Sequence, residues 1–397
     1  MEKEQRLTLA GVTVADFSHA LSAPYGSMLL ADQGADIIKI ENPSGDLFRD
    51  LYKGAYAVVV HRNKRTITLD LKQKEGKEIA WEIIKKADVV IENFTPGAMK
   101  KLGFGYEEVK AVNPRIIYCS LSGYGQTGPY SHLGGYDVVA QAMSGIMQAT
   151  GDPDRLPVRI GLSIVDMGSG MYLAMGILLA LMDREKTGVG QRIEISLLET
   201  ALSWMSPFVA ICSVSGEVPK RWGSGFAPLC PYKVYEAADG LVFIGVSTNG
   251  FWEKFCKAFN LDALYAREEF KDISGRVKNR DEVDRLVQDA MKGFNSADII
   301  NRLREAGVPS SPVNSVKDAM EDVHVQARGC LVTQDHPVSG KITFVRNPIS
   351  RDDKFPEVRF PSPSMGQQTN DILKELGYSD EHIEKFISLG AAVPEKK

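Results

Sequence analysis

The chain of 397 residues has few cysteines and no surplus of positive charge. Its five cysteines are widely spaced, with no CxxC pair and no Cys/His metal spacing, which argues against a disulfide scaffold and a metal site. With 47 Lys and Arg residues against 51 Asp and Glu, the net charge is −4, so no general positive field attracts nucleic acid or an anionic membrane. The start of the chain also lacks the apolar segment of a signal peptide. We therefore expect a cytoplasmic protein with reduced thiols and with neither nucleic acid nor a membrane as partner.

Long apolar runs and a dinucleotide fingerprint are missing as well. The longest apolar stretch, 164–182, contains Asp166 and Ser169, and its unbroken part, 171–182, is too short to cross a bilayer, which predicts a buried helix. The turn after the first predicted strand has no glycine where G-x-G-x-x-G would stand, which argues against a nicotinamide or flavin site. His19 in this turn is either a catalytic base or a structural histidine.

Short β-branched runs alternate with helical segments from residue 8 to about 200, the pattern of βαβ units on a parallel sheet. Predicted strands cover 12–17, 35–41, 89–92, 116–120 and 192–197. Predicted helices cover 24–33, 74–86, 95–102, 137–147 and a long segment after Ser163. The fold class expected is α/β, with a large domain built on a Rossmann-like parallel sheet and a smaller α/β domain.

A stretch rich in Gly, Ser, Pro and Lys at 216–228 has the composition of an inter-domain link. It predicts a large domain over 1–215 and a small domain over 226–320. The segment 321–397 is expected to return to the large domain.

Asp166 stands alone among apolar residues near the start of the long helix, with Gly168 and Gly170 after it. One interpretation is an acidic residue that favours the helix dipole. The other is a covalent nucleophile: a carboxylate needs no base at neutral pH, and helix N–H groups could stabilise an oxyanion. The glycines would leave backbone uncovered for a ligand.

Two further segments are candidates for anion binding. The basic run 61–65, with Lys72 and the pair 100–101, either binds phosphates or forms a solvated face. Residues 93–95 join the end of a strand to the start of a helix, where open α/β sheets bind anions.

Several segments together resemble the class III CoA-transferases, the family of formyl-CoA transferase and carnitine CoA-transferase. They are GADIIKIENPSGD (34–46), NKRTITLDLK (63–72), ADVVIENFTPGAMKKLG (87–103), LSGYGQTGPY (121–130), GYDVVAQAMSGIM (135–147), VDMGSGMYLAMGILLALMDREKTGVGQ (165–191) and AGVPSSPVNSVKDAMEDVHVQARG (306–329). They occur in the expected order over nearly the whole chain.

The resemblance implies roles for individual residues. Asp166 matches the catalytic aspartate, which forms an aspartyl anhydride and then an aspartyl-CoA thioester, and Tyr136, Asp137 and Gly168 match supporting positions. The residues implied in CoA binding are Leu21, Ser22, Leu69, Asp70, Leu71, Lys72, Asn93, Phe94, Thr95, Lys101, Gly134, Gly135, Tyr136 and Asp137. The resemblance also implies acyl-CoA and a carboxylic acid as substrates, no permanently bound cofactor or metal, and a homodimer of interlocked chains.

The sequence departs from formyl-CoA transferase at several positions. Asn42 replaces an arginine, Gly134 a lysine and Leu21 a glutamine, and a glycine-run lid is absent, with only WGSGF at 222–226. These differences favour a bulkier or more apolar acid than formate or oxalate.

Three alternatives stay open. A 2-methylacyl-CoA racemase shares the fold but uses a His-Asp pair where this chain has Tyr136 and Asp137. A non-catalytic CoA-binding protein would not need a buried Asp166. A nicotinamide oxidoreductase lacks support because the glycine fingerprint is missing.

Overall fold

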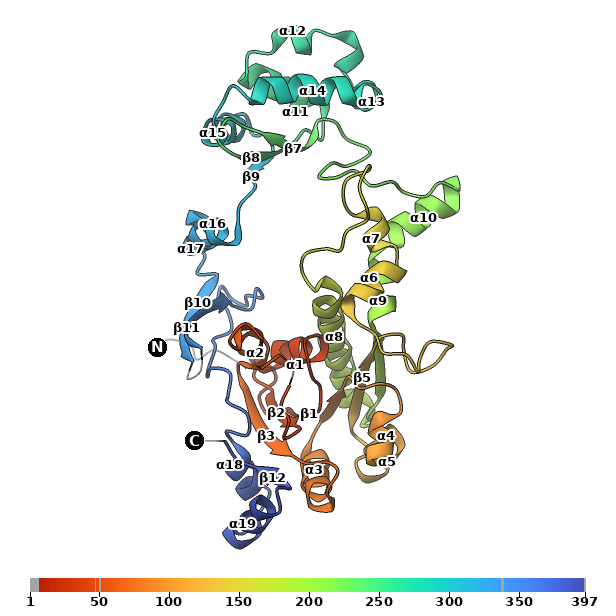
Figure 1. Cartoon of the computed structure of the whole chain (residues 1–397), viewed down its shortest axis with the longest axis vertical. Coiled ribbons are helices and arrows are strands. Elements are labelled where there is room, and N and C mark those ends of the chain that lie inside the picture. Colours follow the sequence, from red (N-terminus) through yellow and green to blue (C-terminus); the bar gives the residue numbers. More distant parts are fainter. Residues whose placement is uncertain (1–6, 47, 50, 337–338, 396–397) are drawn as a thin grey trace. The chain divides into compact units, whose positions relative to one another are not determined.

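The chain divides into two compact units (Figure 1). The structure is a computed structural model that describes residues 7–46, 48–49, 51–336 and 339–395. The first unit comprises 1–146, 159–210 and 327–397, and the second comprises 147–158 and 211–326. The domain boundaries expected from composition stay a prediction; the contact-based division adds residues 147–158 to the second unit.

A seven-stranded sheet forms the centre of the first unit, in the order β12-β3-β2-β1-β4-β5-β6. Its strands are β1 (Thr13–Asp16), β2 (Asp36–Glu41), β3 (Lys64–Leu69), β4 (Val89–Glu92), β5 (Ile117–Ser122), β6 (Arg192–Ser196) and β12 (Ala392–Val393). Only β12 is antiparallel to its neighbour. The predicted mainly parallel α/β sheet is therefore confirmed.

Helices cover both faces of this sheet (Figure 1). They are α1 (Ser22–Asp32), α2 (Ala55–His61), α3 (Lys74–Lys86), α4 (Ala98–Leu102), α5 (Tyr106–Val112), α6 (Asp137–Met143), α8 (Ile164–Thr187), α9 (Leu197–Trp204), α18 (Thr369–Glu375) and α19 (Asp380–Ser388). Two further helices, α7 (Ile146–Ala149) and α10 (Ser206–Ser215), span positions where the chain passes from the first unit to the second. One apolar cluster lies on each face, because successive strand residues such as Val14 and Ala15 point to opposite sides. The first unit also carries the hairpin of β10 (Leu331–His336) and β11 (Gly340–Val345). Helix α17 (Val323–Ala327) belongs to the second unit except for its last residue.

Two predicted helix bounds are wrong, and glycine explains both. The helix expected from Thr95 begins only at Ala98, because Gly97 before it has a φ of 85° that a helix does not allow. The helix expected over 137–147 is interrupted at Gly145, whose φ is 91°. Short helices α6 and α7 replace one long one.

The second unit packs helices on a small antiparallel sheet around its own apolar core. Its elements are β7 (Tyr232–Glu236), β8 (Leu241–Gly245), β9 (Ser310–Pro312), α11 (Asn249–Ala258), α12 (Asp262–Tyr265), η1 (Glu268–Phe270), α13 (Ile273–Lys278), α14 (Arg280–Met291), α15 (Ser296–Ala306) and α16 (Val316–Glu321). Gly307 ends α15 with a φ of 67°, as the sequence predicts.

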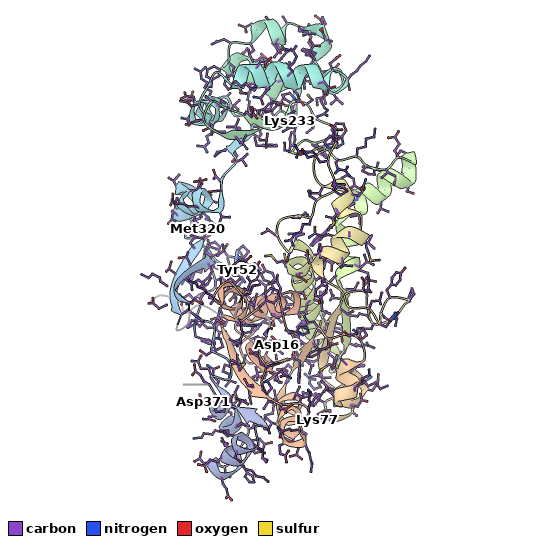
Figure 2. All side chains as sticks on the ribbon, in the orientation of Figure 1. Asp16, Tyr52, Lys77, Lys233, Met320 and Asp371 are labelled. Carbon is purple, nitrogen blue, oxygen red and sulfur yellow. The ribbon has the colours of Figure 1, made fainter. Side chains whose placement is uncertain are left out.

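The basic run 61–65 is neither a phosphate site nor a solvated face, which corrects both interpretations of it. Arg62 and Lys64 are buried and form ion pairs with Asp32 and Asp16, at 2.8 and 3.2 Å. Burial lowers the pKa of Lys64 to about 8, against the opposing effect of Asp16. Figure 2 shows Asp16 inside the first unit. These basic groups therefore form ion pairs inside the first unit.

Helices α1 and α8 lie side by side and touch through their glycines (Figure 1). A Cβ added to Gly170 would lie 2.4 Å from the carbonyl oxygen of Ser22 and 2.9 Å from the nitrogen of Gly26. A Cβ on Gly26 would lie 2.5 Å from the carbonyl oxygen of Gly170. Only glycine at both positions allows this close approach of two backbones.

The face of α8 opposite to α1 is exposed, so the helix that the sequence predicts to be buried is buried on one side only. Its exposed apolar side chains are Met171, Met175, Leu178, Leu179 and Met182. The helix has 24 residues, longer than the unbroken apolar stretch in the sequence. Within the described chain, α8 passes a length and composition test for a membrane span, as does the bent pair α9 and α10, and core helices pass this test too.

We predict that Gly170→Ala destabilises the first unit, because the new methyl group meets backbone atoms that cannot move separately. Overpacking of this kind costs about 1–3 kcal/mol. The matched control is Gly176→Ala on the same helix, where the nearest atom is a side-chain methyl of Ile193 at 3.2 Å. Guanidinium unfolding should show a lower free energy of unfolding for Gly170→Ala only; equal stability of the two variants would contradict the packing argument.

Candidate active site

Two cavities lie at the carboxyl edge of the central sheet. The first, of about 400 Å³, is lined by Phe17, Ser18, His19, Lys39, Ile40, Glu41, Asn42, Ser44, Gly45, Asp46, Leu71, Lys72, Phe94 and Leu102. The second, of about 280 Å³, is lined by His19, Asn93, Phe94, Thr95, Pro96, Ser122, Gly123, Leu133, Gly134, Gly135 and Tyr136. His19 and Phe94 belong to both walls, and their rings pack at a centroid distance of 5.1 Å. The two cavities are therefore neighbours.

Three separate stretches predicted from the sequence contribute to these walls. The residues concerned are Leu71 and Lys72 in the first cavity, Asn93, Thr95, Gly134, Gly135 and Tyr136 in the second, and Phe94 in both. Parallel strands bring these loops to one edge of the sheet. Gly135 is required there for a local reason: a Cβ on it would lie 2.3 Å from the Cα atom of Gly123.

Other predicted CoA residues are not among the residues that line the two cavities. They are Leu21, Ser22, Leu69, Asp70, Lys101 and Asp137. The side chain of Leu69 lies in the apolar core. Asp70 accepts a hydrogen bond from the main-chain nitrogen of Lys72 at 3.0 Å. Direct CoA contact by this group stays a prediction.

Sequence reasoning missed Lys39 and the loop 44–46, although both line the first cavity. Lys39 is a buried cation near the carboxyl end of β2. The signal was present, since a lysine inside the apolar run IIKIE is costly to bury without a role.

Asp137 forms the N-terminal cap of α8 across 28 residues of sequence. Its Oδ2 accepts hydrogen bonds from the main-chain nitrogens of Val165, at 2.7 Å, and Asp166, at 3.1 Å. Gln141 donates to Oδ1 at 2.6 Å and in turn accepts from the nitrogen of Ile160 at 2.9 Å. Because Tyr136 lines the second cavity, this cap connects that cavity to the first turn of α8.

The carboxyl group of Asp166 is mostly buried and has no ion-pair partner within the described residues. Burial, followed by the nearby charge of Asp137, raises the pKa of Asp166 to about 7. A desolvated carboxylate of this kind is a stronger nucleophile than one in water.

Three N–H groups near the start of α8, where the sequence suggested oxyanion donors, already have partners. The N–H groups of Val165 and Asp166 are bound to Asp137, and that of Met167 donates to the carbonyl oxygen of Ser163 at 3.1 Å. These three donors are engaged within the protein.

The structure gives a packing reason for glycine at positions 168 and 170. A Cβ on Gly168 would lie 2.1 Å from the indole ring of Trp204, and Gly170 packs against α1. Both glycines therefore make room for close packing, and a role toward a ligand stays a prediction.

Comparison with known proteins places this chain in a family. The model of CoA-transferase family III matches residues 9–369. The chain belongs to this family and is an enzyme that transfers CoA, with acyl-CoA as a substrate.

Relatives in the same family and solved structures are similar to this chain over nearly its whole length. The succinyl-CoA:glutarate CoA-transferase of Mus musculus is 35% identical over 392 residues, which is 96% of this chain and 89% of the relative. The acetyl-CoA:oxalate CoA-transferase of Acetobacter aceti is 36% identical, covering 92% and 95% of the two chains. The crystal structure of a CAIB/BAIF family protein from Brucella suis has a TM-score of 0.86 at 34% identity, covering 94% of this chain and all of that one.

We predict that Asp166→Asn stabilises the protein above neutral pH. A carboxyl whose pKa is higher in the folded than in the unfolded state stabilises the fold below the unfolded value, near 4, and this stabilisation is lost as pH rises through about 7. The amide never ionises, so the variant avoids that loss, which amounts to at most about 4 kcal/mol.

Urea unfolding at pH 4 and pH 8 measures this effect. The variant should exceed the wild type at pH 8 and match it near pH 4. Asp183→Asn, at an exposed position on the same helix, serves as the control and should change neither. An Asp166→Asn variant with no pH-dependent gain would show that Asp166 is not perturbed.

Proposed function

We propose that this enzyme moves CoA from an acyl-CoA to a free carboxylic acid through covalent intermediates on Asp166. The observation that carries the proposal is a desolvated carboxyl with a raised pKa at the start of α8, tied by Asp137 to the wall of the second cavity. In a family of CoA-transferases, this carboxyl is the group best suited to attack a thioester.

The proposed steps balance without any further reactant. An Asp166 oxygen attacks the thioester carbonyl carbon and the C–S bond breaks. This step releases CoA as a thiolate and leaves a mixed anhydride between Asp166 and the donor acid. The thiolate attacks the Asp166 carbonyl carbon, which releases the donor acid and leaves an aspartyl-CoA thioester. The acceptor carboxylate then reverses both steps, giving the new acyl-CoA and free Asp166.

We propose that CoA occupies the two cavities, with its phosphates near Lys72 and its thioester toward Tyr136 and Asp137. Lys72 is exposed in the wall of the first cavity, and Tyr136 is 74% exposed in the second. Lys101 is exposed near Leu102, another residue of the first wall, and is a second candidate for a phosphate contact.

The acids are proposed from the relatives. Their printed names include glutarate, mesaconate and oxalate as partners of CoA transfer, all dicarboxylates. Leu21, which replaces a glutamine close to the acyl group, and the missing glycine-run lid favour an acid larger than oxalate, so a dicarboxylate of four or five carbons is the first choice.

A second copy of the chain is the proposed partner, in the interlocked arrangement that the family resemblance implies. The exposed apolar face of α8 supports it, because a large apolar stripe on a protein surface favours an interface. We also propose a cytoplasmic location and no permanently bound cofactor; the five free thiols agree with a reducing compartment.

The racemase is the second candidate function. It would need a base for the α-proton, and Tyr136 stands where the racemase histidine is expected. Asp137 is not available for this role without cost, since its carboxylate caps α8.

The purified protein should transfer CoA from succinyl-CoA to an added dicarboxylic acid, and Asp166→Asn should lose at least about a thousandfold in kcat, because an amide does not form the anhydride. Mass spectrometry of the CoA esters, with a panel of dicarboxylic and monocarboxylic acids, measures both. Asp183→Asn should behave as the wild type. Exchange of the α-proton of a 2-methylacyl-CoA in D₂O without CoA transfer would make the racemase assignment correct.

Lys72→Ala should raise the KM for acyl-CoA about fivefold with a smaller change in kcat, since a charge-assisted phosphate contact is lost outside the reacting bonds. The increase of KM with salt should also become weaker. The matched control is Lys74→Ala, an exposed lysine near Glu78 on α3 and outside both cavity walls. Equal KM values for the two variants would remove Lys72 from the CoA site.

A further inference from the structure

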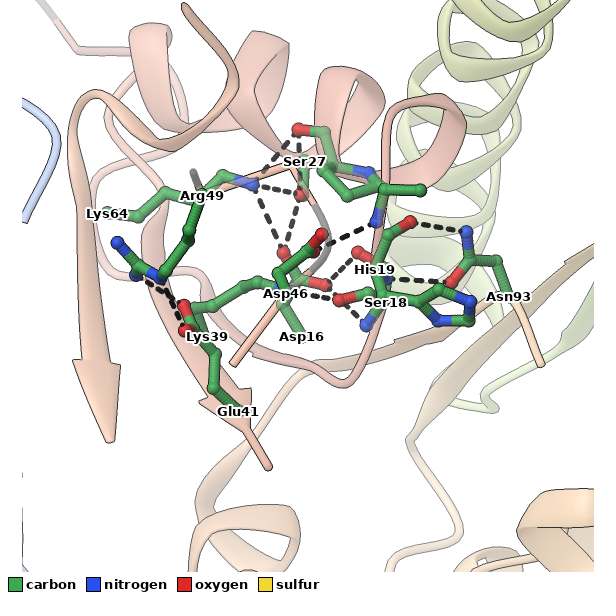
Figure 3. Close-up of polar contacts among 12 residues, drawn as sticks. Asp16, Ser18, His19, Ser27, Lys39, Glu41, Asp46, Arg49, Lys64 and Asn93 are labelled. Carbon is green, nitrogen blue, oxygen red and sulfur yellow. Dashed lines mark hydrogen bonds and ion pairs between the residues drawn. The ribbon is translucent and has the colours of Figure 1, made fainter. Parts of the chain in front are cut away.

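Side chains hold almost every main-chain polar group of the turn between β1 and α1. Ser18, His19 and Ala20 form this turn, which we call the clamped turn (Figure 3). Ala20 has a φ of 61°, a left-handed conformation that is energetically costly for a non-glycine residue. The surrounding contacts must offset that cost.

Buried charges hold the beginning of the clamped turn. Oδ1 of Asp16 accepts a hydrogen bond from the main-chain nitrogen of Ser18 at 3.0 Å, and Nζ of Lys39 donates to the carbonyl oxygen of Ser18. Asp16 is itself bound by Nζ of Lys64, at 3.2 Å, and by the hydroxyl of Ser27, at 2.6 Å. These groups are buried, so water competes little for their hydrogen bonds.

Two residues from other loops hold the rest of the clamped turn. Asn93, after β4, accepts from the main-chain nitrogen of His19 through Oδ1 and donates to its carbonyl oxygen through Nδ2, both at 2.8 Å. Asp46, in the loop after β2, accepts from the main-chain nitrogen of Ala20 at 2.9 Å. Figure 3 shows both side chains directed at the turn.

The clamped turn determines where the ring of His19 lies. His19 is in the walls of both cavities and packs on Phe94, so a change in its backbone would alter both walls at once. The sequence resemblance implies that Asn93 contacts CoA itself. In the structure, its oxygen and its amide nitrogen already bind His19.

We propose that Asn93 and Asp46 are positioning residues that hold His19 as a contact surface for CoA, and that Asn93 acts through His19. This inference rests on the proposed function, since it takes CoA as the occupant of the two cavities. Neither residue needs to touch CoA for its loss to weaken binding.

A double-mutant cycle read by calorimetric titration of the full chain with free CoA tests the proposal. Asn93→Ala and His19→Ala should each weaken CoA binding about five- to tenfold. Added to His19→Ala, the Asn93→Ala change should weaken binding by less than about twofold, because the ring that it positions is gone. A second cycle combines Asp46→Ala with His19→Ala, because Asp46 holds the turn through a different contact. The test therefore does not depend on the folding of one variant.

Asn113→Ala is the matched control. Its side chain also joins two loops, by donating to the carbonyl oxygen of Ala87 at 2.9 Å, but it is outside both cavity walls. It should leave CoA affinity unchanged.

The possible outcomes separate this inference from the proposed function. Multiplicative effects of Asn93→Ala and His19→Ala would show that Asn93 contacts CoA directly or damages the fold generally, and would overturn the inference alone. Failure of the wild type to bind CoA would overturn the proposed function, and the inference with it. Non-additive effects in both cycles would support the positioning role.

Discussion

The close crossing of α1 and α8 is the contact on which the site depends. Gly26 and Gly170 let the two backbones touch, with the carbonyl oxygen of Ser22 directly over Gly170. The clamped turn leads into α1, and Asp166 lies one helical turn before Gly170. Because both helices connect parallel strands, their N-termini meet the same edge of the sheet. The separation of the two glycines therefore sets how near the turn can come to the carboxyl group.

The turn after β1 has no glycine, and buried charged side chains fix its backbone instead. In a dinucleotide fold, glycines in this turn let backbone approach a pyrophosphate. Here Asp16, Lys39 and Lys64 fix the backbone from below, and Asp46 and Asn93 fix it from the sides. Burying three charges costs more than an apolar cluster of the same size would, but their directional hydrogen bonds specify one backbone conformation. These charges thereby define one conformation of a turn whose residues line both cavities.

The sequence predicts the sheet well because β-branched runs and their spacing are local signals. It fails where the role of a residue depends on distant partners. The run 61–65 looks like surface charge until Asp16 and Asp32 are placed beside it. Asp137 follows Tyr136 in a motif but caps a helix that begins 27 residues later. The strand β12 was not predicted at all, since two residues carry no periodicity and gain their conformation only by pairing with β3.

Asp137 links stability to reactivity within one carboxylate. As a cap it satisfies two N–H groups of α8 and so stabilises the start of the helix. Its negative charge, added to burial, also raises the pKa of Asp166 and so opposes ionisation of that carboxyl group. A neutral cap would remove the repulsion but would also leave Asp166 a weaker base and a weaker nucleophile. Asp137 thus both stabilises the start of α8 and raises the pKa of Asp166, so a substitution of Asp137 is expected to change both properties together.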